Sequence, residues 1–214
     1  LGSPVKKFDF KYRDKDKEYH VDRDMTPQAF YDKYVGLDLN QYISVINAPT
    51  EDKPYMRSYT VEMLGNVVGG KEVKYINLDM EDFKKLAIDQ LESGESVWFG
   101  CDVGQFSNNQ SGIMALDTYE LGDLFDVDFS TSKADRLMYG ESLMTHAMVL
   151  TGVDIVDGKP TRWKVENSWG DKVGHKGYYV MTDDWMDQYT YQIVVRKDLL
   201  ADQQRQAFDS QPIL

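Results

Sequence analysis

The dipeptide Asp157-Gly158 constrains the fold of this chain more than any other feature. It separates two runs rich in β-branched and aromatic residues, at positions 145–154 and 162–167. Asp-Gly favours a two-residue hairpin turn because both turn positions need a positive φ. The two runs are therefore predicted to be antiparallel strands. If the turn is tight, the numbers of facing residues add up to 315, so His146 faces position 169.

This register places His146 beside Asn167. Side chains alternate along a strand, so Asn167 shares a face with position 169 and lies diagonal to His146, about 7–8 Å away between Cβ atoms. A longer turn or a bulge would shift the pairing by one residue. An asparagine carbonyl can orient an imidazole and leave its other nitrogen to exchange a proton with a nucleophile. A thiol paired in this way ionises well below its usual pKa of about 8.5.

The predicted site therefore has three residues. His146 is the expected general acid and base, Asn167 orients its ring, and Trp169 supports the pair by keeping water from their hydrogen bond. A histidine taken alone is more often a satisfied core residue. Cys101 follows the apolar run 97–99 and precedes Asp102, so it is predicted to be a buried strand cysteine and not a reactive thiol.

The remaining pattern predicts a mixture of helices and strands. Helices are expected from Thr26-Pro27 to Gly36, from the capping residue Asp79 to residues 93–94, and at 133–139. Further strands are expected at 58–78, folded about Gly69-Gly70, and at 97–101, 178–181 and 189–196. Residues 102–140 are otherwise predicted to be connection. The fold class is α+β, with an antiparallel β-rich C-terminal third.

Composition and charge limit the functions and locations that we expect for this chain. The chain has 214 residues without a Pro, Gly or Ser linker, so one unit is expected, and its net charge of −12 argues against nucleic acid as a partner. No apolar run approaches the roughly 20 residues of a membrane span, and no membrane association is expected. Residues 1–17 are too charged for a signal peptide, and one cysteine forbids an internal disulfide. We expect a cytoplasmic protein.

Metal and cofactor chemistry is not indicated. His20 lies among charged residues and His175 lies in a glycine turn, so both are predicted to be solvated. Three histidines this dispersed do not suggest a zinc site. Asp154 and Asp171, near the predicted pair, are expected to be surface carboxylates. Neither a metal nor a cofactor is therefore expected.

The motifs around the pair resemble those of papain-like cysteine peptidases. That group has a histidine at the head of one strand, here in "THAMVLTGVD", and an Asn-Ser-Trp-Gly motif, here Asn167-Ser168-Trp169-Gly170. The stretches "KKFDFKYRDKDKEYH", "VGLDLNQYISVINAPTEDKPY", "VWFGCDVG" and "YGESLMTHAMVLTGVD" resemble the bleomycin hydrolase and aminopeptidase C branch. The resemblance implies a papain-like fold and intracellular aminopeptidases that assemble as homo-hexamers and act on peptides with a free N-terminus.

The resemblance also implies that part of the enzyme lies elsewhere. The family's nucleophile lies in a Gln-x-x-x-x-x-Cys-Trp segment that opens a helical lobe, and the 214 residues contain no such segment. We therefore expect residues 1–214 to be the β-rich, His- and Asn-bearing C-terminal part, which needs the N-terminal catalytic lobe of the same protein and is inactive alone. The alternative is a non-catalytic assembly or interaction module that retains a papain-like lobe.

Overall fold

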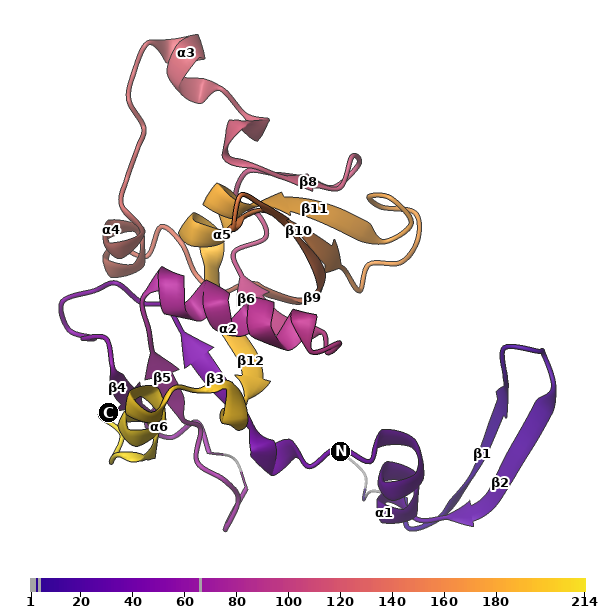
Figure 1. Cartoon of the computed structure of the whole chain (residues 1–214). Coiled ribbons are helices and arrows are strands. Elements are labelled where there is room, and N and C mark those ends of the chain that lie inside the picture. The colour runs from indigo at the N-terminus through magenta and orange to yellow at the C-terminus, as the bar shows by residue number, and fades with distance from the viewer. Residues whose placement is uncertain (1–2, 4, 66) are drawn as a thin grey trace. The chain divides into compact units, whose positions relative to one another are not determined.

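The chain forms two compact units, Leu1–Asn40 and Gln41–Leu214, where the sequence predicted one. The computed structural model describes residues 3, 5–65 and 67–214. No linker composition marks the boundary, which follows a helix that ends at Gly36 with φ of 62°. Each unit is shown in Figure 1.

The N-terminal unit is a hairpin with one short helix packed against it. Its elements are β1 (Phe8–Arg13), β2 (Tyr19–Met25), α1 (Pro27–Phe30) and the π-helical turn η1 (Tyr31–Val35). The predicted helix is confirmed, and the Thr26 hydroxyl caps it by accepting from the Ala29 amide at 3.1 Å. Phe10 lies 4.8 Å from Phe30 and 4.9 Å from Tyr34 between ring centroids. These half-buried rings form an aromatic cluster in this unit.

Most of the larger unit is a mixed sheet. Over the described residues it contains ten strands: β3 (Tyr42–Ile46), β4 (Arg57–Tyr59), β5 (Tyr75–Asn77), β6 (Val97–Cys101), β7 (Ser107–Asn108), β8 (Ile113–Met114), β9 (His146–Val156), β10 (Lys159–Glu166), β11 (Tyr178–Thr182) and β12 (Thr190–Arg196). Their order is β4-β5-β3-β12-β6-β9-β10-β11-β8-β7. The pairs β3–β5 and β8–β11 are parallel, and the others are antiparallel. This mixture of helices and a large sheet confirms the α+β class.

The chain after Val35 also contains helices. They are α2 (Met80–Glu92), α3 (Leu121–Phe125), α4 (Lys133–Met138), α5 (Asp183–Tyr189) and α6 (Asp202–Asp209), with single 3-10 turns η2 (Leu39–Gln41), η3 (Leu116–Thr118) and η4 (Lys197–Leu199). Figure 1 shows α2 crossing the face of the central strands. The Asp79 carboxylate caps α2 as predicted, accepting from the Asp82 amide at 2.9 Å. None of the described helices is both long and apolar enough to cross a membrane.

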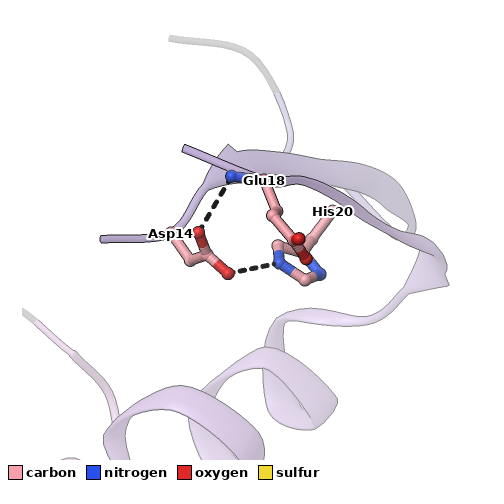
Figure 2. A group of neighbouring side chains, drawn as sticks. All are labelled: Asp14, Glu18 and His20. Atoms are coloured by element: carbon pink, nitrogen blue, oxygen red, sulfur yellow. Dashed lines mark hydrogen bonds and ion pairs between the residues drawn. The ribbon is translucent and has the colours of Figure 1, made fainter. Parts of the chain in front are cut away.

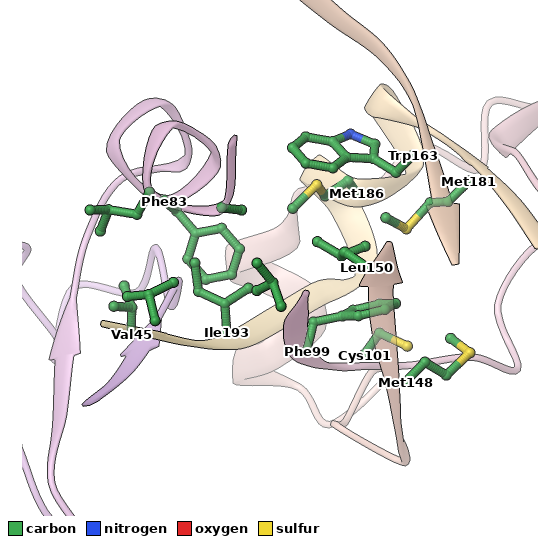
Figure 3. Close-up of a cluster of buried hydrophobic side chains, with 14 of the residues drawn as sticks. Val45, Phe83, Phe99, Cys101, Met148, Leu150, Trp163, Met181, Met186 and Ile193 are labelled. Carbon is green, nitrogen blue, oxygen red and sulfur yellow. The ribbon is translucent and has the colours of Figure 1, made fainter. Parts of the chain in front are cut away.

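The core lies between α2, α5 and the central strands (Figure 3). Phe83 of α2, Phe99 of β6, Leu150 of β9 and Ile193 of β12 are all fully buried. Burying each such side chain contributes about 1.5–3 kcal/mol. Because β9 runs through this core, its position is well defined, and its first residue is His146.

The hairpin of β9 and β10 has the predicted tight turn and two bulges. Asp157 and Gly158 have φ of 51° and 76°. Thr161 is an extra residue in β10, because Pro160 faces Ile155 while Arg162 faces Asp154. Thr151 is an extra residue in β9, and beyond it Glu166 faces Val149. The two irregularities cancel, so the predicted register is restored at the base of the hairpin.

Other predictions are only partly correct. β4 and β5 pair as an antiparallel hairpin, but each has three residues, and the rest of 58–78 is irregular; residue 66 of this range lies outside the described residues. The predicted helix 133–139 and strand 97–101 are confirmed as α4 and β6. The C-terminal third is not purely β, since α5 and α6 interrupt it. Among residues 102–132, predicted as connection, the short elements β7, β8, η3 and α3 form.

Candidate active site

The structure brings His146 and Asn167 into direct contact. His146 Nε2 lies 2.9 Å from Asn167 Oδ1. Asn167 is 8% exposed, whereas His146 is half-buried. The imidazole is therefore partly accessible to solvent, and the asparagine that binds it is buried. Asn167 follows the last residue of β10, and its backbone is held there because the Asn167 N–H donates to the Gly177 carbonyl at 3.0 Å. The predicted juxtaposition is therefore confirmed.

The hydrogen bonds of Asn167 assign the tautomer of His146. The Ser168 backbone N–H donates to Asn167 Oδ1 at 2.8 Å, so this atom must be the carbonyl oxygen of the side chain. The oxygen only accepts, so Nε2 of His146 carries a proton and donates to it. In the neutral ring, Nδ1 is then the basic nitrogen. The site can accept a proton at Nδ1 and stabilise the resulting imidazolium through Nε2.

Trp169 packs on the imidazole as expected for a supporting residue. The two ring centroids are 4.7 Å apart and the planes are tilted by 30°. Tyr179 of β11 also lies near the indole, with the ring centroids 6.5 Å apart in an edge-on arrangement. Burial raises the pKa of Tyr179, and contact with the Asn167 side chain lowers it in part. Trp169 itself is 42% exposed, so one surface of the indole is open to solvent.

Cys101 is buried, as predicted. It faces His146 across the β6–β9 ladder, yet it is 0% exposed and packs in the hydrophobic core. Burial raises the pKa of the Cys101 thiol well above its usual value, and the charge of Asp102 raises it further. A nucleophilic thiol needs the opposite environment, with a cation or a helix N-terminus nearby. Cys101 therefore lacks the surroundings of a reactive thiol.

The other histidines do not join this site. His175 lies in the turn before β11, where its backbone N–H donates to the Tyr178 carbonyl at 2.9 Å. Asp154 and Asp171 are exposed, as expected. His20 was predicted to be solvated but is half-buried in the N-terminal unit, with Nε2 2.8 Å from Asp14 Oδ2.

Asp14, Glu18 and His20 form a group at the end of the β1–β2 hairpin (Figure 2). One ligand atom from each lies within 4.8 Å of the others, a spacing compatible with a divalent cation. Oδ1 of Asp14 already accepts from the amides of Asp16 and Glu18 at 2.9 Å each. These bonds explain the group as a local turn structure. The sequence indicates that these three side chains could lie close together, since they lie within seven residues.

The sequence analysis did not identify one buried lysine. Lys133, at the start of α4, is 7% exposed. Its ammonium donates to Asn47 Oδ1 at 2.7 Å and to the Thr190 carbonyl at 2.6 Å, and it lies 5.0 Å from the centroid of the Tyr191 ring. Burial lowers the pKa of Lys133 to about 7. A lysine at the first position of a predicted helix gives no sequence signal of burial.

Comparison with known proteins gives the family. The sequence model of the Peptidase C1-like family matches residues 1–214. Aminopeptidase C of Streptococcus thermophilus is 62% identical over 99% of this chain and 48% of the relative, and aminopeptidase C of Listeria monocytogenes is 51% identical over 100% and 48%. The crystal structure of PepW from Lactobacillus rhamnosis HN001 matches with 63% identity and a TM-score of 0.91, over 97% of this chain and 46% of that one.

The chain spans about half the length of these curated relatives. The match nevertheless covers both units and every residue of the candidate site. The resemblance to papain-like peptidases of the bleomycin hydrolase and aminopeptidase C branch is thereby confirmed. This chain belongs to the Peptidase C1-like family.

Proposed function

We propose that this chain supplies the histidine and asparagine of a cysteine aminopeptidase that removes N-terminal residues from peptides. The observation that carries the proposal is the His146–Asn167 hydrogen bond, whose geometry leaves Nδ1 of His146 as the base. The names of the relatives support the reaction class. Peptides with a free amino group are the proposed substrates.

The proposed thiol lies outside these 214 residues. The one cysteine of the chain, Cys101, is buried with a raised pKa, and the chain matches about half the length of its relatives. We therefore propose that a lobe of the same protein supplies the nucleophile. A homo-hexamer in the cytoplasm is the assembly and location that we propose, on the resemblance and on the use of a single cysteine.

The proposed reaction proceeds in two acyl-transfer steps. Nδ1 of His146 takes the thiol proton, and the thiolate attacks the carbonyl carbon of the first peptide bond. The imidazolium then protonates the amide nitrogen as the C–N bond breaks, which releases the shortened peptide and leaves a thioester. His146 next takes a proton from water, and the resulting hydroxide attacks the thioester. The released N-terminal amino acid and the free thiol complete the cycle.

Asn167 and Trp169 have supporting roles in this scheme. The Asn167 carbonyl holds the protonated Nε2 and stabilises the imidazolium that forms in each step. Trp169 covers one face of the ring, which limits access of water to the bond.

Hydrolysis of an aminoacyl-arylamide by the full-length protein that carries this chain tests the proposal. We expect His146→Ala to lower kcat at least about a thousandfold, because the general base is lost. Asn167→Ala should lower kcat about a hundredfold, because the ring loses its orientation. His175→Ala is the matched control, and kcat should not change. Full activity of His146→Ala would refute the proposal and would favour a non-catalytic assembly module.

The 214-residue chain gives a second test. By itself it should not hydrolyse the same arylamide, because Cys101 cannot act as the nucleophile. Turnover by the chain alone, lost in His146→Ala, would refute the placement of the thiol outside residues 1–214.

A further inference from the structure

A buried polar cluster lies next to the head of β9, and the proposed reaction does not use it. Asp102, directly after β6, is 6% exposed, and Ser142, which precedes β9, is 2% exposed. Ser142 Oγ donates to Asp102 Oδ2 at 2.8 Å, and Thr145 Oγ1 donates to Asp102 Oδ1 at 3.2 Å. Each oxygen of one carboxylate thus binds a different end of the segment 142–145, which leads into His146.

Asp102 is itself fixed from the opposite side. Its backbone N–H donates to the Tyr189 carbonyl at 3.0 Å, and Gln105 Nε2 donates to Oδ2 at 3.2 Å. The hydroxyl of Tyr191 forms a short hydrogen bond with Ser142 Oγ. Because Ser142 donates its proton to the carboxylate, Tyr191 donates to Ser142. The cluster therefore connects β12, the end of β6 and the segment 142–145.

Backbone hydrogen bonds link this cluster to His146. The Thr145 N–H donates to the Cys101 carbonyl at 3.0 Å, and the next residue, His146, faces Cys101 in the ladder. Thr145 is therefore held both by its amide and by its hydroxyl. The adjoining residues Leu143 and Met144 are 61% and 49% exposed. The Ser142 backbone N–H also donates to the Arg136 carbonyl at 3.3 Å, and the bonds to Asp102 restrain the side chains at both ends of the segment.

A buried carboxylate is costly unless hydrogen bonds compensate its lost hydration. Packing alone would favour an apolar residue at position 102, after the apolar strand β6. The carboxylate offers what an apolar residue lacks, namely two acceptors on one rigid group that bind two hydroxyls three residues apart. Thr190 illustrates the contrast, because its buried hydroxyl makes no hydrogen bond with any described group.

We propose that Asp102 is a positioning residue, which holds the segment 142–145 so that the His146 ring meets Asn167 at hydrogen-bond distance. Asp102 acts through Thr145 and Ser142 and does not touch the reacting atoms. The inference rests on the proposed function, since it concerns how the general base is oriented. A misplacement of about 1 Å at a catalytic group can lower the rate about a hundredfold.

The test uses the full-length protein that carries this chain, with arylamide hydrolysis, the rate of thiol alkylation by iodoacetamide, and Tm measured on each variant. Asp102→Asn removes the charge and one acceptor, and we expect kcat to fall about a hundredfold with KM within about twofold. Thr145→Val removes one hydroxyl at constant shape and should lower kcat about tenfold. Thr145→Ser restores the hydroxyl and should restore kcat. Thr190→Val, the matched control, removes an unpartnered hydroxyl and should leave kcat unchanged.

Alkylation separates positioning from simple destabilisation. A correctly placed imidazole keeps the thiol ionised, so Asp102→Asn and Thr145→Val should alkylate more slowly at temperatures well below their Tm. Wild-type kcat and alkylation rates in both variants would overturn the inference, as would a loss that follows the unfolded fraction and is not restored by Thr145→Ser. Wild-type activity in His146→Ala would instead overturn the proposed function itself, so the two failures are distinguishable.

Discussion

The buried amine of Lys133 predicts a particular dependence of stability on pH. Desolvation lowers the pKa of this amine to about 7 from its usual 10.5. The unfolded chain therefore binds a proton that the folded chain does not, at every pH between these two values. Above about pH 10.5 both states are neutral and burial of the amine carries no ionisation penalty. As the pH falls towards 7, the unfolded state gains this proton and stability is lost.

The size of the effect follows from the two pKa values. Each pH unit between them changes the free energy of unfolding by about 1.4 kcal/mol at most. From pH 9.5 to pH 7, the contribution of Lys133 should lower the stability of the native protein by about 3 kcal/mol. Lys133→Met keeps much of the side-chain length and removes the titrating group. The substitution also removes the hydrogen bonds to Asn47 and Thr190, and this loss lowers the free energy of unfolding by an amount that depends much less on pH.

Urea unfolding measured by tryptophan fluorescence is a suitable assay, because the four tryptophans all lie in the unit Gln41–Leu214. The difference in stability between wild type and Lys133→Met should change by about 3 kcal/mol between pH 7 and pH 9.5, in favour of wild type at the higher pH. Other groups that titrate in this range cancel in the comparison. Parallel pH curves for the two proteins would refute the reasoning, since they would show that the carbonyl acceptors and the Tyr191 ring keep the ammonium charged.

Three further perturbations test the fold and the site. Cys101→Ala should leave kcat of the full-length protein within about twofold at temperatures where it is folded, and a loss comparable to that of His146→Ala would make this thiol the nucleophile. Gly174→Ala should destabilise the chain by about 2–4 kcal/mol in urea, because φ is 57° and the new Cβ would lie 2.5 Å from the Tyr178 carbonyl oxygen. Asp79→Ala should cost about 1 kcal/mol through loss of the α2 cap; no change in the urea midpoint would contradict the capping role.

The site was predictable from one turn and from strand alternation because the two bulges, at Thr151 and Thr161, cancel. Asp157-Gly158 sets the register, and the alternation of side chains places Asn167 diagonal to His146, as the structure shows. Helix α2 was equally clear, because its cap and its apolar spacing agree. The catalytic roles of these residues remain predictions, since geometry alone does not test them.

Other parts depend on tertiary contacts that a sequence pattern does not display. Lys133 gives no local sign that Asn47 and Thr190, both far away in the chain, accept from its amine. Asp102 likewise meets Ser142 only after β6 and β9 pair. The turn glycines 69 and 70 indicate a hairpin, but not that its strands stop after three residues. The boundary at residue 40 follows from contacts within each unit, and no composition change marks it.

The paired irregularities at Thr151 and Thr161 have a consequence for anyone who re-engineers this hairpin. Each one adds a residue to its own strand, and they leave the far end in phase only together. Deleting either threonine alone should shift the pairing between that bulge and the site by one residue. The side chain of His146 or of Asn167 would then point to the other face of the sheet, away from its partner. Deleting both threonines should shorten the hairpin and keep the hydrogen bond between His146 and Asn167. Loop grafts at the tip should therefore be chosen by residue count before sequence.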